Sequence, residues 1–180
     1  MTTQNPVYAS QAKPWLKYYA QKYIDQTLPT LSAFDYVCHR NRNHLNDTAL
    51  DYYGRKFTYA DLIVNVKKTA AALRGVGVKK GDIVTIALPN IPSAVTLFYA
   101  VNKLGMTANL VHPLLPAEQI IRYATETKSK FLFVFDKLAD GYISKLLDCP
   151  VPIRICQAQD YITSVSYTHL RAHETGAYLV

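Results

Sequence analysis

Two short uncharged runs constrain the fold of this chain most strongly. Residues 83–88 carry no charged side chain and are rich in β-branched residues, and residues 131–135 are apolar throughout. Strands that are apolar on both faces are typical of a parallel sheet covered by helices, because neither face of such a sheet meets water. A membrane-spanning helix needs about 20 apolar residues, and Pro89 and Pro92 interrupt the uncharged window 83–102. We therefore expect buried strands and no transmembrane segment.

Helix patterns alternate with the strand patterns along the chain. Thr58 is a predicted N-cap, and Asp61, three residues later, completes an acidic capping box. Apolar residues then recur at helical spacing until two glycines end the helix. We expect helices that begin near Ser32, Thr58, Pro92 and Pro116, and a further helix through Ile143, Leu146 and Leu147. The expected strands are 48–53, 56–58, 83–88, 107–111, 131–135 and 153–156. The first two of these strands form a hairpin with its turn at Gly54-Arg55. This alternation predicts an α/β fold, with a mostly parallel sheet and helices on both of its faces.

The two ends of the chain depart from this pattern. Residues 1–30 form a helical preamble, whose aromatic stripe is typical of a face that docks against the body of a protein. The stripe comprises Trp15, Tyr18, Tyr19 and Tyr23, with Lys22 among them. Residues 164–180 show no helical or strand period and resemble, codon by codon, a translation of the transposase adaptor used in short-read sequencing libraries. We predict that native sequence ends near Thr163, which leaves residues 31–163 as the body.

The charge balance is basic, with 20 Lys and Arg against 13 Asp and Glu and a net charge of +7. Such a balance favours anionic partners, which include nucleic acid, a membrane surface and phosphorylated small molecules. The basic residues are scattered, however, and the densest groups are pairs such as Lys67-Lys68 and Lys79-Lys80. A solvated basic surface is the better interpretation, and we expect no nucleic-acid partner.

Motifs that would hold a metal or a dinucleotide are incomplete. The three cysteines, Cys38, Cys149 and Cys156, lack C-x-x-C spacing, which indicates neither a zinc site nor a disulfide framework and favours a reducing, cytoplasmic setting. His39 and His44 have no further ligand at a suitable spacing. The glycines at 75–77 follow a predicted helix, whereas a dinucleotide-binding loop follows a strand. We predict no metal-ligating or cofactor-binding residue.

His112 is the one position whose place in the predicted fold suggests a ligand. It follows the strand expected at 107–111, and α/β sheets place their ligand crevices at the carboxyl ends of strands. The imidazole can donate to a substrate carboxylate or phosphate, or it can hydrogen-bond the loop, and we favour the structural role. No complete catalytic constellation is present, so we predict no catalytic residue and regard His112 only as a crevice-lining candidate.

Several short motifs, taken in order, resemble AMP-forming acyl-activating enzymes over roughly residues 31–161. They are GRKFTYADL at 54–62, GVKKGDIV at 77–84, LPNIP at 88–92, AVNKLGMTAN at 100–109 and His112-Pro113. Within that superfamily, residues 108–114 look most like acyl-CoA synthetases. The resemblance implies that the chain is an N-terminal fragment, containing an incomplete first subdomain of the acyl-activating enzyme fold.

The resemblance also implies the chemistry of the intact enzyme. A carboxylic acid, fatty or other acyl, reacts with ATP to give an acyl-adenylate, and coenzyme A then takes the acyl group, with Mg²⁺ required. The phosphate-binding loop, the Asp and Arg motifs and the C-terminal Lys of that family lie outside this chain, so no catalytic residue is carried over. We expect the fragment to be inactive alone, to bind these cofactors poorly and to be marginally folded or poorly soluble.

Two alternatives remain open at this stage. An amino-acid adenylation domain would share the family but would load a carrier protein in place of coenzyme A. A small, self-contained α/β binding module without catalysis would belong to another class altogether. The resemblance implies that the pocket for the acyl substrate lies mainly outside this chain.

Overall fold

The computed structural model describes residues 8–25, 27, 29–145 and 149–156 of the 180-residue chain. It divides into two compact units, Met1–Thr30 and Leu31–Val180. The predicted adaptor-like segment, residues 164–180, lies outside the described residues, as do Leu146 and Leu147 of the last expected helix. The origin of that segment therefore stays a prediction.

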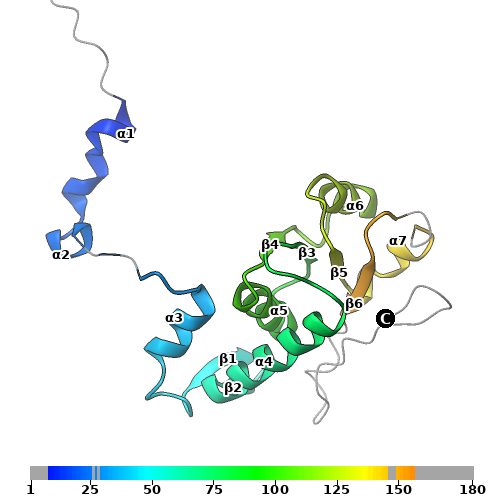
Figure 1. Ribbon diagram of the computed structural model, residues 1–180, viewed down its shortest axis with the longest axis horizontal. Helices are drawn as coiled ribbons and strands as arrows, with labels where there is room; N and C mark the ends of the chain where they lie inside the picture. The colour runs from blue at the N-terminus through cyan, green and yellow to red at the C-terminus, as the bar shows by residue number, and fades with distance from the viewer. Residues whose placement is uncertain (1–7, 26, 28, 146–148, 157–180) are drawn as a thin grey trace, which may run out of the picture. The chain divides into compact units, whose positions relative to one another are not determined.

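The first unit consists of three short helical pieces (Figure 1). They are α1 (Ala9–Ala12), the 3₁₀ helix η1 (Pro14–Tyr18) and α2 (Gln21–Ile24). Lys13 has a left-handed φ of 44°, and Tyr19 and Ala20 are extended, so the helix is interrupted twice. The aromatic stripe expected at helical spacing is therefore divided between separate pieces. Its docking against the body of the protein stays a prediction.

A capped helix opens the second unit. In α3 (Ala33–Arg40), Ser32 is the N-cap, and its Oγ accepts a hydrogen bond from the Asp35 N–H at 3.1 Å, as the sequence predicted. Phe34 of this helix is 2% exposed. Its N–H donates to Asn102 Oδ1 at 2.9 Å, which ties the helix to a distant part of the chain.

The hairpin that follows turns one residue earlier than expected. Strands β1 (Thr48–Tyr52) and β2 (Arg55–Thr58) are antiparallel, and Arg55 already pairs with Tyr52. The turn residues are Tyr53 and Gly54, with φ of 51° and 82°. Two consecutive left-handed residues match the right-handed twist of the strands, so the pair 53–54 is favoured over the predicted Gly54-Arg55.

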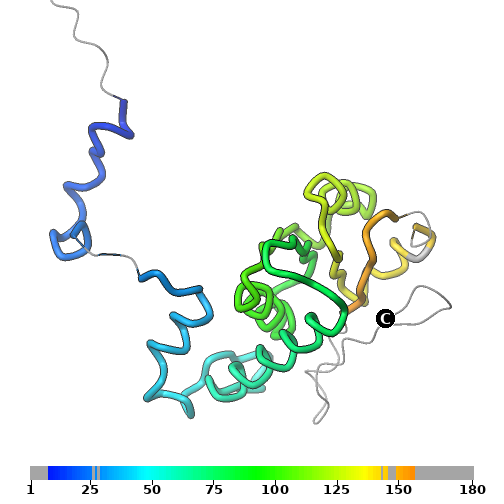
Figure 2. Tube along the Cα trace, viewed as in Figure 1, coloured from blue at the N-terminus to red at the C-terminus, as the bar shows by residue number. Residues whose placement is uncertain are grey.

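The main sheet is parallel and four-stranded, in the order β4-β3-β5-β6. Its strands are β3 (Ile83–Ala87), β4 (Thr107–Leu110), β5 (Phe131–Phe135) and β6 (Ile153–Cys156). The helices that alternate with them are α4 (Tyr59–Gly75), α5 (Pro92–Lys103), α6 (Ala117–Glu126), the 3₁₀ turn η2 (Asp136–Leu138) and α7 (Asp140–Ile143). Figure 2 follows this path from β1 in cyan to β6 in orange. The predicted α/β fold with a mostly parallel sheet is confirmed.

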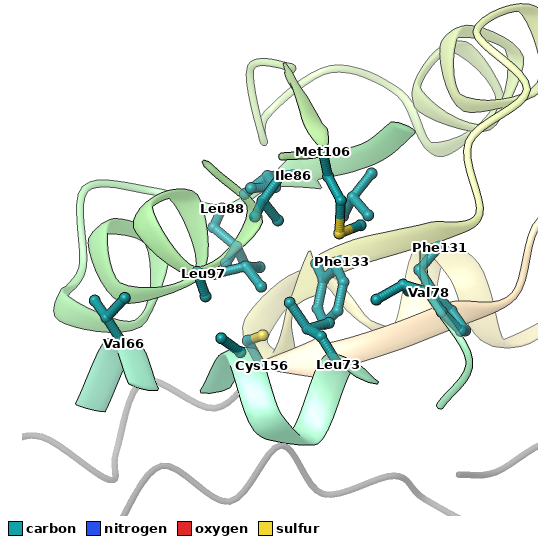
Figure 3. Close-up of a cluster of buried hydrophobic side chains, with 14 of the residues drawn as sticks. Val66, Leu73, Val78, Ile86, Leu88, Leu97, Met106, Phe131, Phe133 and Cys156 are labelled. Carbon is teal, nitrogen blue, oxygen red and sulfur yellow. The ribbon is translucent and has the colours of Figure 1, made fainter. Parts of the chain in front are cut away.

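Helices cover both faces of the sheet, and the side chains of the central strand β5 alternate between an apolar cluster on one face and a second cluster on the other. Phe131 and Phe133 of β5 join a cluster with residues of α3, α4 and α5. Leu132 and Val134, the intervening residues, join a second cluster with residues of α6 and α7. Figure 3 shows Phe133 pointing toward Leu73 of α4 within the first cluster.

The capping box predicted at the start of α4 is present. Asp61 N–H donates to Thr58 Oγ1 at 3.1 Å, and Thr58 N–H donates to the Asp61 carboxylate at 2.9 Å. We expect Thr58→Ala to lower the free energy of unfolding by about 1 kcal/mol, since one helical N–H loses its acceptor. Urea denaturation followed by circular dichroism measures this loss. Thr58→Ser keeps the hydroxyl and should recover most of it, and equal losses in the two variants would contradict the cap.

Burial of Tyr142 makes the stability of the second cluster pH-dependent. The side chain is 3% exposed, and burial, with a smaller contribution from the Glu118 carboxylate, raises its pKa from 10.0 to about 12. The pKa of Tyr142 is higher in the folded state than in the unfolded state. Its contribution to the free energy of unfolding is therefore complete below pH 10 and is lost as the pH rises toward 12. We expect Tyr142→Phe to be less sensitive to pH across that window in urea denaturation. Parallel pH curves for the two proteins would contradict this.

The described sheet has two outer strands, β4 and β6. On β4 the side chain of Leu110 is 63% exposed, and the nearby Leu114 is 73% exposed. Exposed apolar side chains beside an unpaired edge favour association with other chains. They support the expectation of poor solubility, which stays a prediction.

Candidate functional site

The carboxyl ends of β3, β4 and β5 meet at one edge of the sheet, because the three strands are parallel. The segments that follow them enclose a cavity of about 350 Å³. It is lined by Leu88, Pro89, Asn90, His112, Pro113, Leu114, Phe135 and Leu138. A crevice at this edge is the usual place for a ligand in an open α/β sheet. We call this cavity, with its lining residues, the carboxyl-edge cleft.

A second hollow of about 540 Å³ adjoins the carboxyl-edge cleft. The two share Leu88, Asn90, His112 and Pro113, and the second extends along α5 to Phe98 and Tyr99. His112 and its neighbours therefore form the wall between two adjoining spaces. The sequence placed His112 in the lining of a crevice, and the structure agrees.

The hydrogen bond made by His112 occupies one of its two ring nitrogens. The Leu114 N–H donates to Nδ1 of His112 at 3.3 Å. In the neutral ring, a nitrogen that accepts has no proton, so this hydrogen bond assigns the proton to Nε2. The loop-bonding role favoured from the sequence is thus present, and it leaves Nε2–H as a donor.

The walls of the carboxyl-edge cleft are largely apolar. Among the described residues that line it, the polar side chains are those of Asn90 and His112, and none is a carboxylate, a lysine or a thiol. Such a lining suits a ligand with an apolar part and one or two hydrogen-bonding groups. Of its polar side chains, the Asn90 amide and the His112 imidazole can bind and orient a ligand through hydrogen bonds.

A buried polar network, which sequence reasoning missed, holds the adjoining strand β4. Thr85 is fully buried, and its Oγ1 lies 2.7 Å from Ser129 Oγ and accepts from Asn109 Nδ2 at 3.0 Å. Thr127 Oγ1 lies 2.9 Å from Ser129 Oγ and joins the same network. The network connects β3 to β4 and to the segment before β5. One signal was available, namely a threonine inside an otherwise aliphatic strand.

The histidines considered as metal ligands form a local contact. His44 Nδ1 lies 2.9 Å from the Asp47 carboxylate, three residues away on an exposed segment. His39 is exposed near the end of α3. In the part of the chain that the structure describes, no three His, Cys, Asp or Glu side chains are grouped so that they could hold a metal ion.

The cysteines are free thiols with different surroundings. Cys156 is 3% exposed, and burial, together with the Asp136 carboxylate, raises the pKa of its thiol to about 12. Burial also raises the pKa of Cys38 and of Cys149. A protonated thiol is a poor nucleophile. Cys156 therefore acts as a residue of the core and not as a nucleophile.

Within the described residues, no helix combines the length and the apolar character that crossing a bilayer requires.

Comparison with known proteins identifies the relatives of this chain. A long-chain-fatty-acid–CoA ligase of Bacillus subtilis (strain 168) is 28% identical over 152 residues, which are 83% of this chain and 27% of the relative. The solved structure of an anthranilate CoA ligase in complex with anthranoyl-AMP matches with a TM-score of 0.66 and 25% identity, over 76% of this chain and 27% of that one. A long-chain-fatty-acid-CoA ligase from Archaeoglobus fulgidus shares the fold, with a TM-score of 0.67 and 18% identity, over 81% of this chain and 30% of that one.

The chain therefore spans less than a third of the length of these relatives. The resemblance to acyl-CoA synthetases is confirmed, as is the kinship of the sheet with the first subdomain of the acyl-activating fold. The family described as AMP-binding enzyme matches residues 37–174. Because that match covers most of its length, the chain belongs to the AMP-binding enzyme family.

Proposed function

We propose that the chain is the first portion of an acid–CoA ligase. In the first step a carboxylate oxygen of the acid attacks the α-phosphorus of ATP, and pyrophosphate leaves. In the second step the thiol of coenzyme A attacks the acyl carbon, loses its proton and displaces AMP. The observation that carries this proposal is the match to the family over residues 37–174, together with relatives that are CoA ligases.

In this proposal the described part of the chain forms one wall of the enzyme and supplies no reacting group. The carboxyl-edge cleft presents the Nε2–H of His112 and the amide of Asn90. Both can orient an oxygen acceptor, such as a phosphate or a carboxylate of a reactant. The described lining residues include no carboxylate, and we expect the carboxylates that hold Mg²⁺ to come from another part of the enzyme.

The same proposal includes a domain organisation, a cellular compartment and a class of substrate. Residues 31–163 are proposed as a partial adenylate-forming domain, residues 1–30 as a preamble and residues 164–180 as a non-native tail, the first part of which the family match, ending at residue 174, overlaps. We place the enzyme in the cytoplasm, and the three free thiols support a reducing compartment. The substrate is a fatty or other acyl acid.

The acceptor of the acyl group provides the test. The complete product of the reading frame is incubated with ATP, Mg²⁺, coenzyme A and a panel of acetate, long-chain and aromatic acids, and mass spectrometry is used to detect the thioester. We expect acyl-CoA, AMP and pyrophosphate in equal amounts with at least one acid. Activation of amino acids without any acyl-CoA would overturn the proposal in favour of an enzyme that loads a carrier protein.

A further inference from the structure

The first unit presents more aromatic surface than its own residues can cover. Between residues 8 and 25 the large exposed side chains are Tyr8, Trp15, Tyr18, Tyr19 and Tyr23, which are 44% to 79% exposed. Within the three described helical pieces of this unit, no residue is buried. The pieces are four or five residues long, too short to form a stable helix in water without a packing partner.

The charge of this segment is mainly positive. Residues 8–25 include Lys13, Lys17 and Lys22 and one acidic residue, Asp25, at their end. Lys17 Nζ lies 4.9 Å from the centre of the Tyr18 ring, and Lys22 Nζ lies 4.8 Å from the Tyr23 ring. Each of these pairs places a cation beside an amphipathic ring on an exposed surface.

Tryptophan and tyrosine favour the boundary between water and hydrocarbon, since each ring has an apolar body and a polar group. Lysine stems can lie along the apolar layer while their ammonium groups contact anionic headgroups. This segment lacks the dense basic cluster of a nucleic-acid groove, and its five exposed aromatic side chains, which suit a bilayer interface, outnumber its three lysines. We propose that residues 8–25, in place of the docking against the body expected from the sequence, bind peripherally to the anionic surface of a lipid bilayer, a function beyond the ligase reaction and independent of it.

Trp15 provides a direct probe, because it is the one tryptophan of the chain. Fluorescence of the full 180-residue chain is recorded as vesicles of phosphatidylcholine with phosphatidylglycerol are added. We expect a blue shift of Trp15 emission and co-flotation of the chain with these vesicles. Pure phosphatidylcholine vesicles should produce neither effect. Flotation separates binding from aggregation, because aggregates sediment.

Two matched variants are compared, one with three lysines of the first unit replaced by glutamine and one with three lysines of the second unit replaced. The Lys13→Gln, Lys17→Gln, Lys22→Gln variant should lose binding roughly 100-fold, since each lysine near an anionic surface contributes about fivefold. Lys79, Lys128 and Lys130 are exposed in the second unit. Their replacement by Gln gives the same change in net charge and should leave binding within about twofold, since these lysines do not belong to the segment proposed to contact the bilayer.

Three results would overturn the proposal. The first is an unchanged Trp15 spectrum with anionic vesicles, both in this chain and in the complete product of the reading frame. The second is equal loss of binding in the two triple variants, which would indicate a response to net charge alone. The third is binding of a duplex oligonucleotide that exceeds binding to the vesicles, which would assign the segment to nucleic acid.

Discussion

Replacing Leu132 by alanine is expected to lower the free energy of unfolding by about 3–5 kcal/mol. Leu132 is fully buried in β5, between β3 and β6, and its side chain belongs to the cluster that α6 and α7 cover. Alanine leaves a cavity that the surrounding strands can only partly close. A loss of this size is comparable with the whole stability of a small domain, so urea denaturation should show a strongly shifted or absent transition.

Leu114 provides the matched control for this substitution. Its side chain is 73% exposed, so Leu114→Ala removes the same atoms from a position that water already reaches. We expect a change within about 0.5 kcal/mol. Equal losses at Leu132 and Leu114 would show that β5 is not in the interior of the fold.

The second large effect is expected at the buried polar network. Thr85→Val keeps the shape of the side chain but removes the hydroxyl that accepts from Asn109 and contacts Ser129. A buried group left without its partner costs about 1–3 kcal/mol, so we expect a loss in that range. Thr107→Val is the control, since Thr107 is an exposed residue of β4. It should be nearly neutral, since valine fits a strand well.

A double-mutant cycle with Ser129→Ala tests whether the network acts as a unit. Thr85 Oγ1 and Ser129 Oγ are 2.7 Å apart, and groups in one network are expected to couple by about 0.5–3 kcal/mol. The free energies of unfolding of the two single variants and the double variant measure this coupling. Strict additivity would contradict a direct contact between the two hydroxyls.

Local patterns predicted most of the elements of the second unit. The capping box at Thr58 and Asp61 depends on residues three apart, so the sequence contains all of it. The β-branched run ending at Ala87 and the aromatic run ending at Phe135 each form a strand of the buried sheet. Their side chains are apolar in both directions, so both faces of each strand are covered and neither is in contact with water. These features required no knowledge of the tertiary structure.

The errors arose where tertiary or conformational detail decides the outcome. Because Tyr53 has a left-handed φ, the hairpin turn lies one residue earlier than predicted. Tyrosine is not a residue type that indicates this conformation in a sequence. The contact between Thr85 and Ser129 joins residues 44 positions apart and depends on the register of β3 against β5. Such a contact cannot be seen in a window of sequence.

The candidate site was predicted in position but not in composition. His112 follows a parallel strand, which placed it at the edge where ligands bind. Asn90, Phe135 and Leu138 come from two other segments of the chain and have side chains common in any loop or core. The sheet brings them together, so their role depends on strand order, which the sequence did not specify.

Whether these residues build one part of a larger ligase is decided by acid-dependent exchange of pyrophosphate into ATP. The exchange is measured with the same panel of acids for the 180-residue chain and for the complete product of its reading frame. We expect exchange with at least one acid for the complete product and none above background for the chain, since the described lining of the carboxyl-edge cleft holds neither a lysine nor a carboxylate. Exchange at comparable rates by the chain alone would contradict it.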